Sequence, residues 1–196
     1  MPRFDLFKPT LVDGRPGIPS YRDLLEVLST GRSSATHAEA AAGVAEPRRI
    51  MLRHDVDSNL VSAVRQARLE AELGLKATFY VLHPGDGGPS NYYGTIVDGR
   101  IEHEPQLVDA MHEMRSLGHE VGLHYDLLQL AERTGREPLD LLREELEWFS
   151  SVGVPLEGAA SHGSAFARTH SFVNYEVLHE AAALRPKAAG EQPVER

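Results

Sequence analysis

The chain has 196 residues, 41% of them apolar, and its 20 Lys and Arg against 29 Asp and Glu give a formal charge of −9. This acidic balance, without a Lys- or Arg-rich run, argues against a nucleic-acid or anionic-membrane partner. The absence of cysteine excludes disulfides, thiolate catalysis and cysteine zinc sites, whereas ten histidines leave metal chemistry with His and carboxylate ligands open.

The length predicts one globular domain, which we place at residues 1–185, followed by a polar, disordered tail over residues 186–196. The N-terminus lacks an apolar stretch of signal-peptide length, and no run approaches the ~20 residues of a membrane span. We therefore expect a soluble cytoplasmic protein. The sequence does not indicate its oligomeric state.

Apolar stripes at helical spacing alternate along the chain with β-branched and aromatic runs. The predicted helices cover residues 21–28, 59–74, 107–117, 138–153 and 173–184. The predicted strands run from Arg49 into Asp55 and over residues 77–82, 119–124 and 156–161. Residues 29–47 are predicted as a connecting loop or weak surface helix, and residues 83–94 as a loop.

Strands separated by helices of this length predict a parallel sheet with right-handed crossovers, either open or closed into a barrel. In both cases the catalytic and ligand-binding residues lie at the carboxyl ends of the strands. Three polar clusters fall at such ends: Asp55 with Asp57, His124 with Asp126, and Ser161 with His162. Their coincidence is the main sequence evidence for a functional site.

Strand alternation sorts these residues by face. Asp55 and Asp57 share a face, as do His124 and Asp126, whereas His54 and His119 point to the opposite layer and are expected to be structural. Arg53 shares the face of Asp55 and could orient it through a charge-assisted bond. A competing interpretation makes the paired carboxylates a strand end followed by a helix N-cap.

Carboxylates and imidazoles together suit zinc, and also Mn, Fe, Co or Ni. Such an ion activates water and polarises a carbonyl while a free carboxylate takes the proton, which predicts amide or ester hydrolysis. The sequence has no His-Glu-x-x-His motif, nucleotide-binding glycine pattern or Gly-x-Ser-x-Gly elbow. Those alternatives are therefore not supported.

Three places in the sequence, taken together, carry a resemblance to a known family. These are the motif Arg53-His54-Asp55-Val56-Asp57, the strand at residues 76–80 and the segment Gly-His-Glu-Val-Gly-Leu-His at 118–124. They resemble the polysaccharide deacetylase (NodB-homology, carbohydrate esterase family 4) superfamily. The resemblance covers about residues 50–162. It implies an irregular (β/α) barrel, and a metal-dependent hydrolase that removes acyl groups from N-acylated sugars. It also implies that Asp55 is the catalytic base and that Asp57 and His124 bind the metal, most simply zinc.

Two positions depart from the family pattern. The second metal histidine usually follows the first by four residues, where this chain has Leu128. We assign the third ligand to His162, with Asp126 as the alternative. The late histidine that acts as general acid is not identifiable, although His170 and His179 are late in the sequence. We therefore expect a divergent barrel that is incomplete at its C-terminus.

Three hypotheses follow, in order of preference. The first is a metal-dependent carbohydrate deacetylase acting on a carbohydrate or small N-acylated substrate. The second is a non-catalytic carbohydrate-binding protein that keeps the fold but lacks the general acid. The third assigns the polar clusters to helix caps and sheet-end hydrogen bonds.

Overall fold

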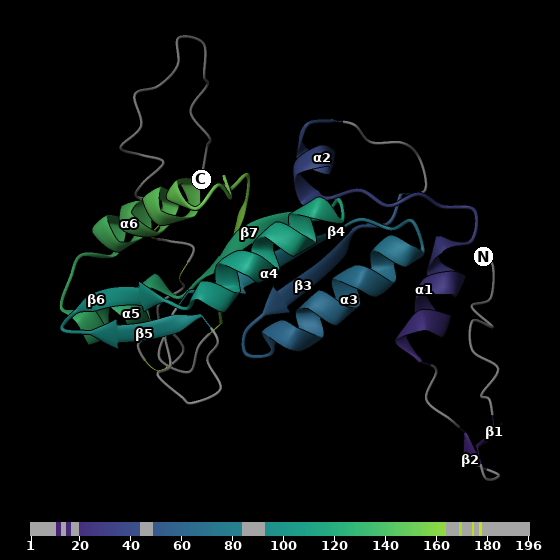
Figure 1. The fold of residues 1–196 in the computed structure, drawn as a ribbon, viewed down its shortest axis with the longest axis horizontal. Coiled ribbons are helices and arrows are strands. Elements are labelled where there is room, and N and C mark those ends of the chain that lie inside the picture. The colour runs from purple at the N-terminus through teal and green to yellow at the C-terminus, as the bar shows by residue number, and fades with distance from the viewer. Residues whose placement is uncertain are drawn as a thin grey trace.

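The computed structural model describes residues 11–12, 15–16, 20–43, 49–83 and 93–163, together with residues 169, 174 and 177. Its main sheet has four parallel strands in the order β3-β4-β7-β8 and is curled into a half-barrel (Figure 1). These strands are β3 (Leu52–Val56), β4 (Ala77–Leu82), β7 (Glu120–Tyr125) and β8 (Ala159–Ser161). Two antiparallel pairs lie outside this sheet: β1 (Leu11–Val12) with β2 (Arg15–Pro16), and β5 (Gly94–Val97) with β6 (Arg100–His103).

The helices connect these strands and pack outside the sheet (Figure 1). They are α1 (Tyr21–Ser29), α2 (His37–Ala41), α3 (Leu60–Glu72), α4 (Pro105–Ser116), α5 (Leu127–Thr134) and α6 (Pro138–Ser151). Helices α3 and α4 lie side by side along the sheet, and α5 packs against α6. The parallel strands therefore place their carboxyl ends along one edge of the half-barrel.

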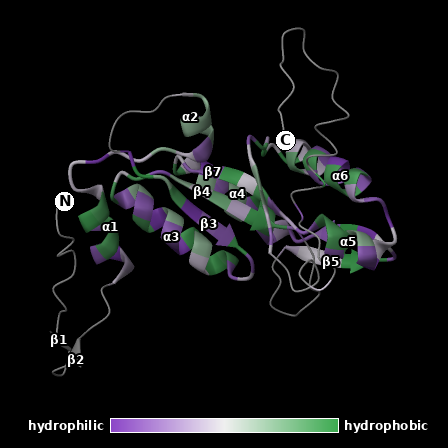
Figure 2. Cartoon of the chain, turned by 180° about the vertical axis from the view of Figure 1, so that it is seen from behind, coloured by the Kyte–Doolittle hydropathy of each residue, from purple (hydrophilic) through white to green (hydrophobic). Residues whose placement is uncertain are grey.

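Helix α3 illustrates why the sequence folds in this way. The side chain of Asn59 accepts a hydrogen bond from Ser62 N and caps the helix, while Gly74 follows it with φ +70°. Leu60, Ala63 and Ala67, at helical spacing, are buried against the sheet. Figure 2 shows the same division between hydrophobic and hydrophilic faces on several helices.

Helix α2 closes the amino-terminal end of the sheet. The backbone N–H of His37 donates to Thr78 Oγ1 at 2.9 Å, and that of Ala38 donates to Glu120 Oε2 at 2.9 Å. Thr78 also donates to Glu120. Glu120 is thus buried with hydrogen-bond donors supplied by a helix start and a neighbouring strand. Because α2 covers the amino end of the sheet, a site would lie at the opposite, carboxyl end.

The predicted parallel α/β organisation is confirmed, and the predicted strand at residues 77–82 matches β4. The four parallel strands form a half-barrel, and nothing in the described part of the chain tests the complete barrel. The first strand begins at Leu52 and not at Arg49, because Ile50 instead forms an isolated bridge with Ser34. The last strand is shorter than predicted, beginning at Ala159.

Sequence reasoning missed the hairpin β5–β6, which begins in the segment expected to be a loop, and helix α5, which starts directly after β7. Helix α2 lies in the stretch for which a weak surface helix was one of the two predicted alternatives. Helix α5 is too short to repeat an apolar stripe several times, so periodicity did not reveal it. The predicted helix 173–184 and tail 186–196 lie outside the described residues, apart from positions 174 and 177.

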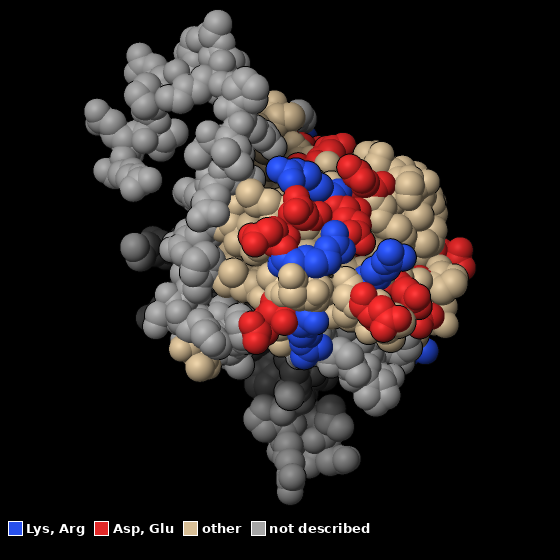
Figure 3. Space-filling model, turned by 90° about the vertical axis from the view of Figure 1, so that its left-hand side faces the viewer, with Lys and Arg blue, Asp and Glu red and all other residues tan. Residues whose placement is uncertain are grey.

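Charged side chains of both signs are interspersed on the end of the molecule that carries α6 (Figure 3). Arg136 pairs with Glu144 at 2.6 Å, and Arg143 pairs with Asp140 at 2.6 Å. Among the described residues, no helix is long and apolar enough to cross a membrane.

Candidate functional site

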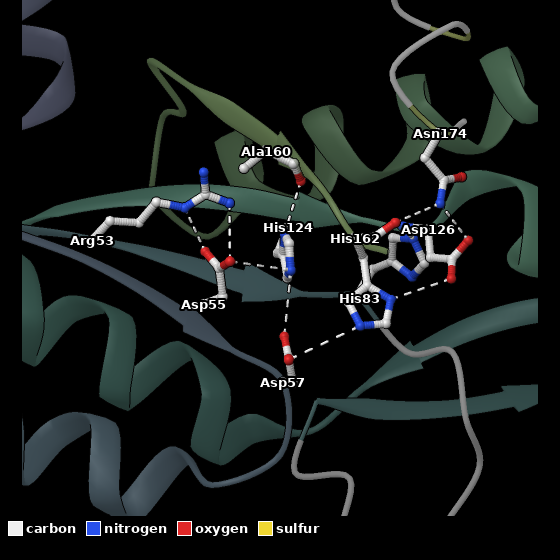
Figure 4. Close-up of polar contacts among 9 residues, drawn as sticks. All are labelled: Arg53, Asp55, Asp57, His83, His124, Asp126, Ala160, His162 and Asn174. Atoms are coloured by element: carbon white, nitrogen blue, oxygen red, sulfur yellow. Dashed lines mark hydrogen bonds and ion pairs between the residues drawn. The ribbon is translucent and has the colours of Figure 1, made fainter. Parts of the chain in front are cut away.

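Asp57, His124 and His162 converge at the carboxyl edge of the sheet (Figure 4). His124 Nε2 lies 3.4 Å from Asp57 Oδ1, and His162 Nε2 lies 4.0 Å from Asp57 Oδ2. One ligand atom from each residue lies within 4.8 Å of the other two. This is the candidate metal site of the structure.

Sheet topology brings these three residues together from distant parts of the sequence. Asp57 follows β3 directly, His124 is near the end of β7, and His162 follows β8. Because β3, β4, β7 and β8 are parallel, their carboxyl ends meet at one edge. The curl of the sheet brings the end of β3 towards the ends of β7 and β8, although β4 lies between them (Figures 1 and 4).

Hydrogen bonds of the Nδ1 nitrogens orient both imidazoles. His124 Nδ1 lies 2.9 Å from the carbonyl oxygen of Ala160, which can only accept, so Nδ1 carries the proton and donates. His162 Nδ1 lies 3.3 Å from Asp126 Oδ2, an acceptor when the carboxyl group is ionised. In neutral rings this leaves both Nε2 lone pairs directed at Asp57, as metal-binding histidines require.

Asp126 belongs to a network behind His162. Asn174 Nδ2 donates to Asp126 Oδ1 and to the carbonyl oxygen of His162, both at 2.8 Å. The backbone N–H of Asp126 donates to His83 Nε2 at 2.6 Å, and its side chain accepts a bond of 3.4 Å from Gln129 N to cap α5. Asp126 therefore supports His162 and the chain turn after β7, whereas the three converging ligand atoms come from other residues.

The site combines a buried and an open side. The side chain of His124 is only 3% exposed, while those of His162 and Asp57 are 27% and 48% exposed. Burial lowers the pKa of His124, and its bond to Ala160 together with the carboxylates of Asp55 and Asp57 opposes the shift. His124 is consequently neutral at neutral pH, the form that coordinates metal, and the open side admits a ligand.

Asp55 lies beside the converging ligand atoms. Its Oδ2 is 3.9 Å from His124 Nε2, and both its oxygens accept hydrogen bonds from Arg53, at 2.7 Å from Nε and 2.9 Å from Nη2. The Arg53 guanidinium also lies 5.1 Å from the centre of the Tyr80 ring. This bidentate pair fixes the carboxylate next to the site without burying it.

The donor set fits a divalent transition metal ion. Zinc ligands at about 2.0–2.1 Å in a tetrahedron lie roughly 3.4 Å from one another, close to the 3.4 Å separation of His124 and Asp57. The pair formed by His162 and Asp57 is wider, at 4.0 Å, so an ion bound by both would draw these two side chains closer together. Two imidazoles and one carboxylate leave a fourth position for water or substrate.

The predicted roles of the neighbouring histidines are also resolved. His54 points away from the site, stacks on Phe79 and lies 2.6 Å from buried Glu70. His119 is buried and bonds to the backbone through both ring nitrogens, with Ala77 N as donor and Ala67 O as acceptor. Both are structural residues, as strand alternation predicts.

The helix-cap interpretation is wrong for Asp57, because the N-cap of α3 is Asn59, and it is right for Asp126. His83 and Asn174 were missed. His83 directly follows β4, the same position relative to its strand that Asp57 has to β3, so its place in the sequence could have revealed it. His170 and His179 lie outside the described residues.

Comparisons of the chain with known protein families, with curated proteins and with solved structures gave no match.

Proposed function

We propose that the protein is a metal-dependent hydrolase that removes an acetyl or other acyl group from an N-acylated sugar. The observation that carries this proposal is the convergence of Asp57, His124 and His162 beside a separately held carboxylate, Asp55. The first three would hold the ion, and zinc fits their chemistry best. The order of motifs along the half-barrel also resembles that of polysaccharide deacetylases, whose complete barrel is part of the proposal.

Each residue has a role in amide hydrolysis. A bound divalent ion would supply a Lewis acid that polarises the acyl oxygen and acidifies water. Asp55 accepts a proton from the water that attacks the acyl carbon, and Arg53 keeps the carboxylate facing the site. Asp55 then returns the proton to the nitrogen as the C–N bond breaks, which yields a carboxylic acid and a free amine.

Asp126 and Ala160 contribute indirectly, by orienting the two histidine rings. The Asp126 carboxylate holds Nδ1 of His162, and the Ala160 carbonyl holds Nδ1 of His124, so that neither ring rotates away from Asp57. Metal binding would then require little rearrangement of the buried His124. Orientation of both rings before binding favours affinity because less conformational freedom is lost.

Two measurements test this function. Purified protein should bind about one equivalent of zinc, and Asp57→Ala should lose that binding. The zinc-loaded protein should release acetate from N-acetylated oligosaccharides, while Asp55→Asn should keep zinc and lose turnover. Glycan binding without acetate release would replace the proposal with a non-catalytic carbohydrate-binding protein. Unchanged zinc affinity in Asp57→Ala would overturn the metal site itself.

A further inference from the structure

A polar groove of about 370 Å³ lies beside the candidate site, between β3 and the start of α3. One wall is β3 from Arg53 to Val56 together with Asp57, which follows it, and the other is the start of α3. Asp55 and Asp57 belong both to this groove and to the candidate site. A molecule lying in the groove would therefore reach the carboxylates at which we place the reaction.

The helical wall presents hydroxyl and amide groups. Ser58, Asn59, Ser62 and Gln66 line it, with the last three on one face of α3 at spacings of three and four residues. The side chains of Ser58, Ser62 and Gln66 form no hydrogen bonds with any other described residue. Their donors and acceptors are available to a ligand.

The opposite wall adds backbone hydrogen-bonding groups. β3 is the first strand in the sheet order and pairs with β4 on one side only. Among the described residues, its other side is paired only just before the strand, where Ile50 bridges Ser34. Alternate N–H and C=O groups of an edge strand face away from its partner strand, and residues Arg53 to Val56 of this edge strand line the groove.

The charges of the groove identify the class of ligand. Arg53 is neutralised by Asp55, and His54 is held by buried Glu70. Asp57 is the remaining charged residue among those that line the groove. The groove thus offers hydroxyl, amide and backbone groups but no unpaired cation that could hold a phosphate or carboxylate.

On this basis we propose that the groove binds the non-reacting part of the substrate, and that this part is an uncharged, polyhydroxylated sugar unit next to the acylated one. The inference rests on the proposed function and adds substrate specificity to it. A volume of 370 Å³ is near the lower end of ligand sites, which are roughly 300–1,000 Å³, and therefore suits a short segment. Ser62 and Gln66 are the specificity-determining residues.

The test compares substrates that do and do not fill the groove. KM and kcat are measured by acetate release from N-acetylglucosamine, from its neutral oligomers and from oligomers carrying uronic acids. The double variant Ser62→Ala/Gln66→Ala should raise KM for the neutral oligomers about tenfold, from the loss of about two hydrogen bonds, and leave the monosaccharide unaffected. Ser62→Phe, which fills the groove, should do the same. Arg65→Ala, on the exposed face of the same helix, is the matched control.

Zinc affinity and thermal unfolding of each variant separate loss of the groove from loss of the fold. Unchanged KM for oligomers in both groove variants, or a preference for uronic-acid oligomers, would overturn the groove assignment while acetate release keeps the proposed function. If no substrate releases acetate, binding of deacetylated oligomers is measured by calorimetry. If the oligomers bind and the groove variants abolish this binding, the groove assignment stands and the proposed hydrolase function is rejected. If the oligomers do not bind, the groove assignment is rejected. A KM change for N-acetylated peptides alone would assign the groove to peptides.

Discussion

His162 Nδ1 lies 3.3 Å from Asp126 Oδ2, and the opposite nitrogen of the same ring lies 4.0 Å from Asp57 Oδ2. A carboxylate behind an imidazole fixes its tautomer and raises its basicity towards a metal. Asp126 was an alternative third ligand on sequence grounds. In the structure it lies behind the His162 ring as a hydrogen-bond partner of Nδ1.

Asp126→Asn tests this relationship. Asn keeps a side-chain oxygen that can cap α5, but it removes the negative charge behind His162. We expect zinc affinity to fall about 10- to 100-fold with little change in thermal stability. Competition with a chromogenic chelator measures the affinity. An unchanged affinity would show that His162 does not depend on Asp126. Asp140→Asn, which removes a surface carboxylate paired with Arg143, is the control.

Arg53→Lys tests the placement of Asp55. Lysine keeps the positive charge but cannot form the bidentate bond, so the Asp55 carboxylate loses its fixed orientation. We expect kcat for acetate release to fall about tenfold or more while zinc affinity is unchanged. Arg68→Lys removes an equivalent bidentate pair with Glu113 on the surface and should leave kcat as it is. Equal effects of the two substitutions would contradict the role of Arg53.

His119 makes the stability of the fold depend on pH. Burial lowers its pKa below the ordinary value of 6.5, against the opposing effects of Ala67 O and Glu70. The unfolded chain therefore binds a proton near pH 6.5 that the folded chain does not, and stability present above this pH is lost as the pH falls further. This residue contributes at most about 1.4 kcal/mol per pH unit.

Urea denaturation of metal-free protein between neutral and mildly acidic pH measures this effect. His119→Gln cannot titrate, although its amide can still donate to Ala67 O. The variant should be less stable at neutral pH because Ala77 N loses its acceptor, yet its stability should change less with pH. The same pH dependence in both proteins would mean that other groups cause it.

Gly122→Ala should destabilise the fold, because it would crowd β7 against Tyr80 of β4. A Cβ at this position would lie 2.5 Å from the Tyr80 ring and 2.9 Å from the carbonyl oxygen of Gly158. Tyr80 has little freedom to move, because its hydroxyl lies 2.9 Å from His37 Nδ1. We expect a loss of about 1–3 kcal/mol in the free energy of unfolding. Gly163→Ala, where a Cβ meets no atom within 4 Å, should cost much less.

The contribution of sequence reasoning differs between elements. Long amphipathic repeats and the run 77–82 predicted α3, α4, α6 and β4, because local periodicity reflects burial on one side of each element. The hairpin β5–β6 and helix α5 were missed because each is too short to establish a period. Alternation along β3 assigned Arg53 and Asp55 to one face and His54 to the other, and the contacts of all three agree.

The sequence by itself determined the parallel α/β class, the faces of the strands and the residues at their carboxyl ends, because these follow from neighbours close in the chain. It left two candidates, His162 and Asp126, for one position. Only the tertiary structure showed which of the two lies against Asp57. The curl of the sheet sets the distance from Asp57, which follows β3, to residues more than sixty positions away. The support of His162 by Asp126 and Asn174 likewise depends on contacts across 36 and 12 residues, which no local pattern records.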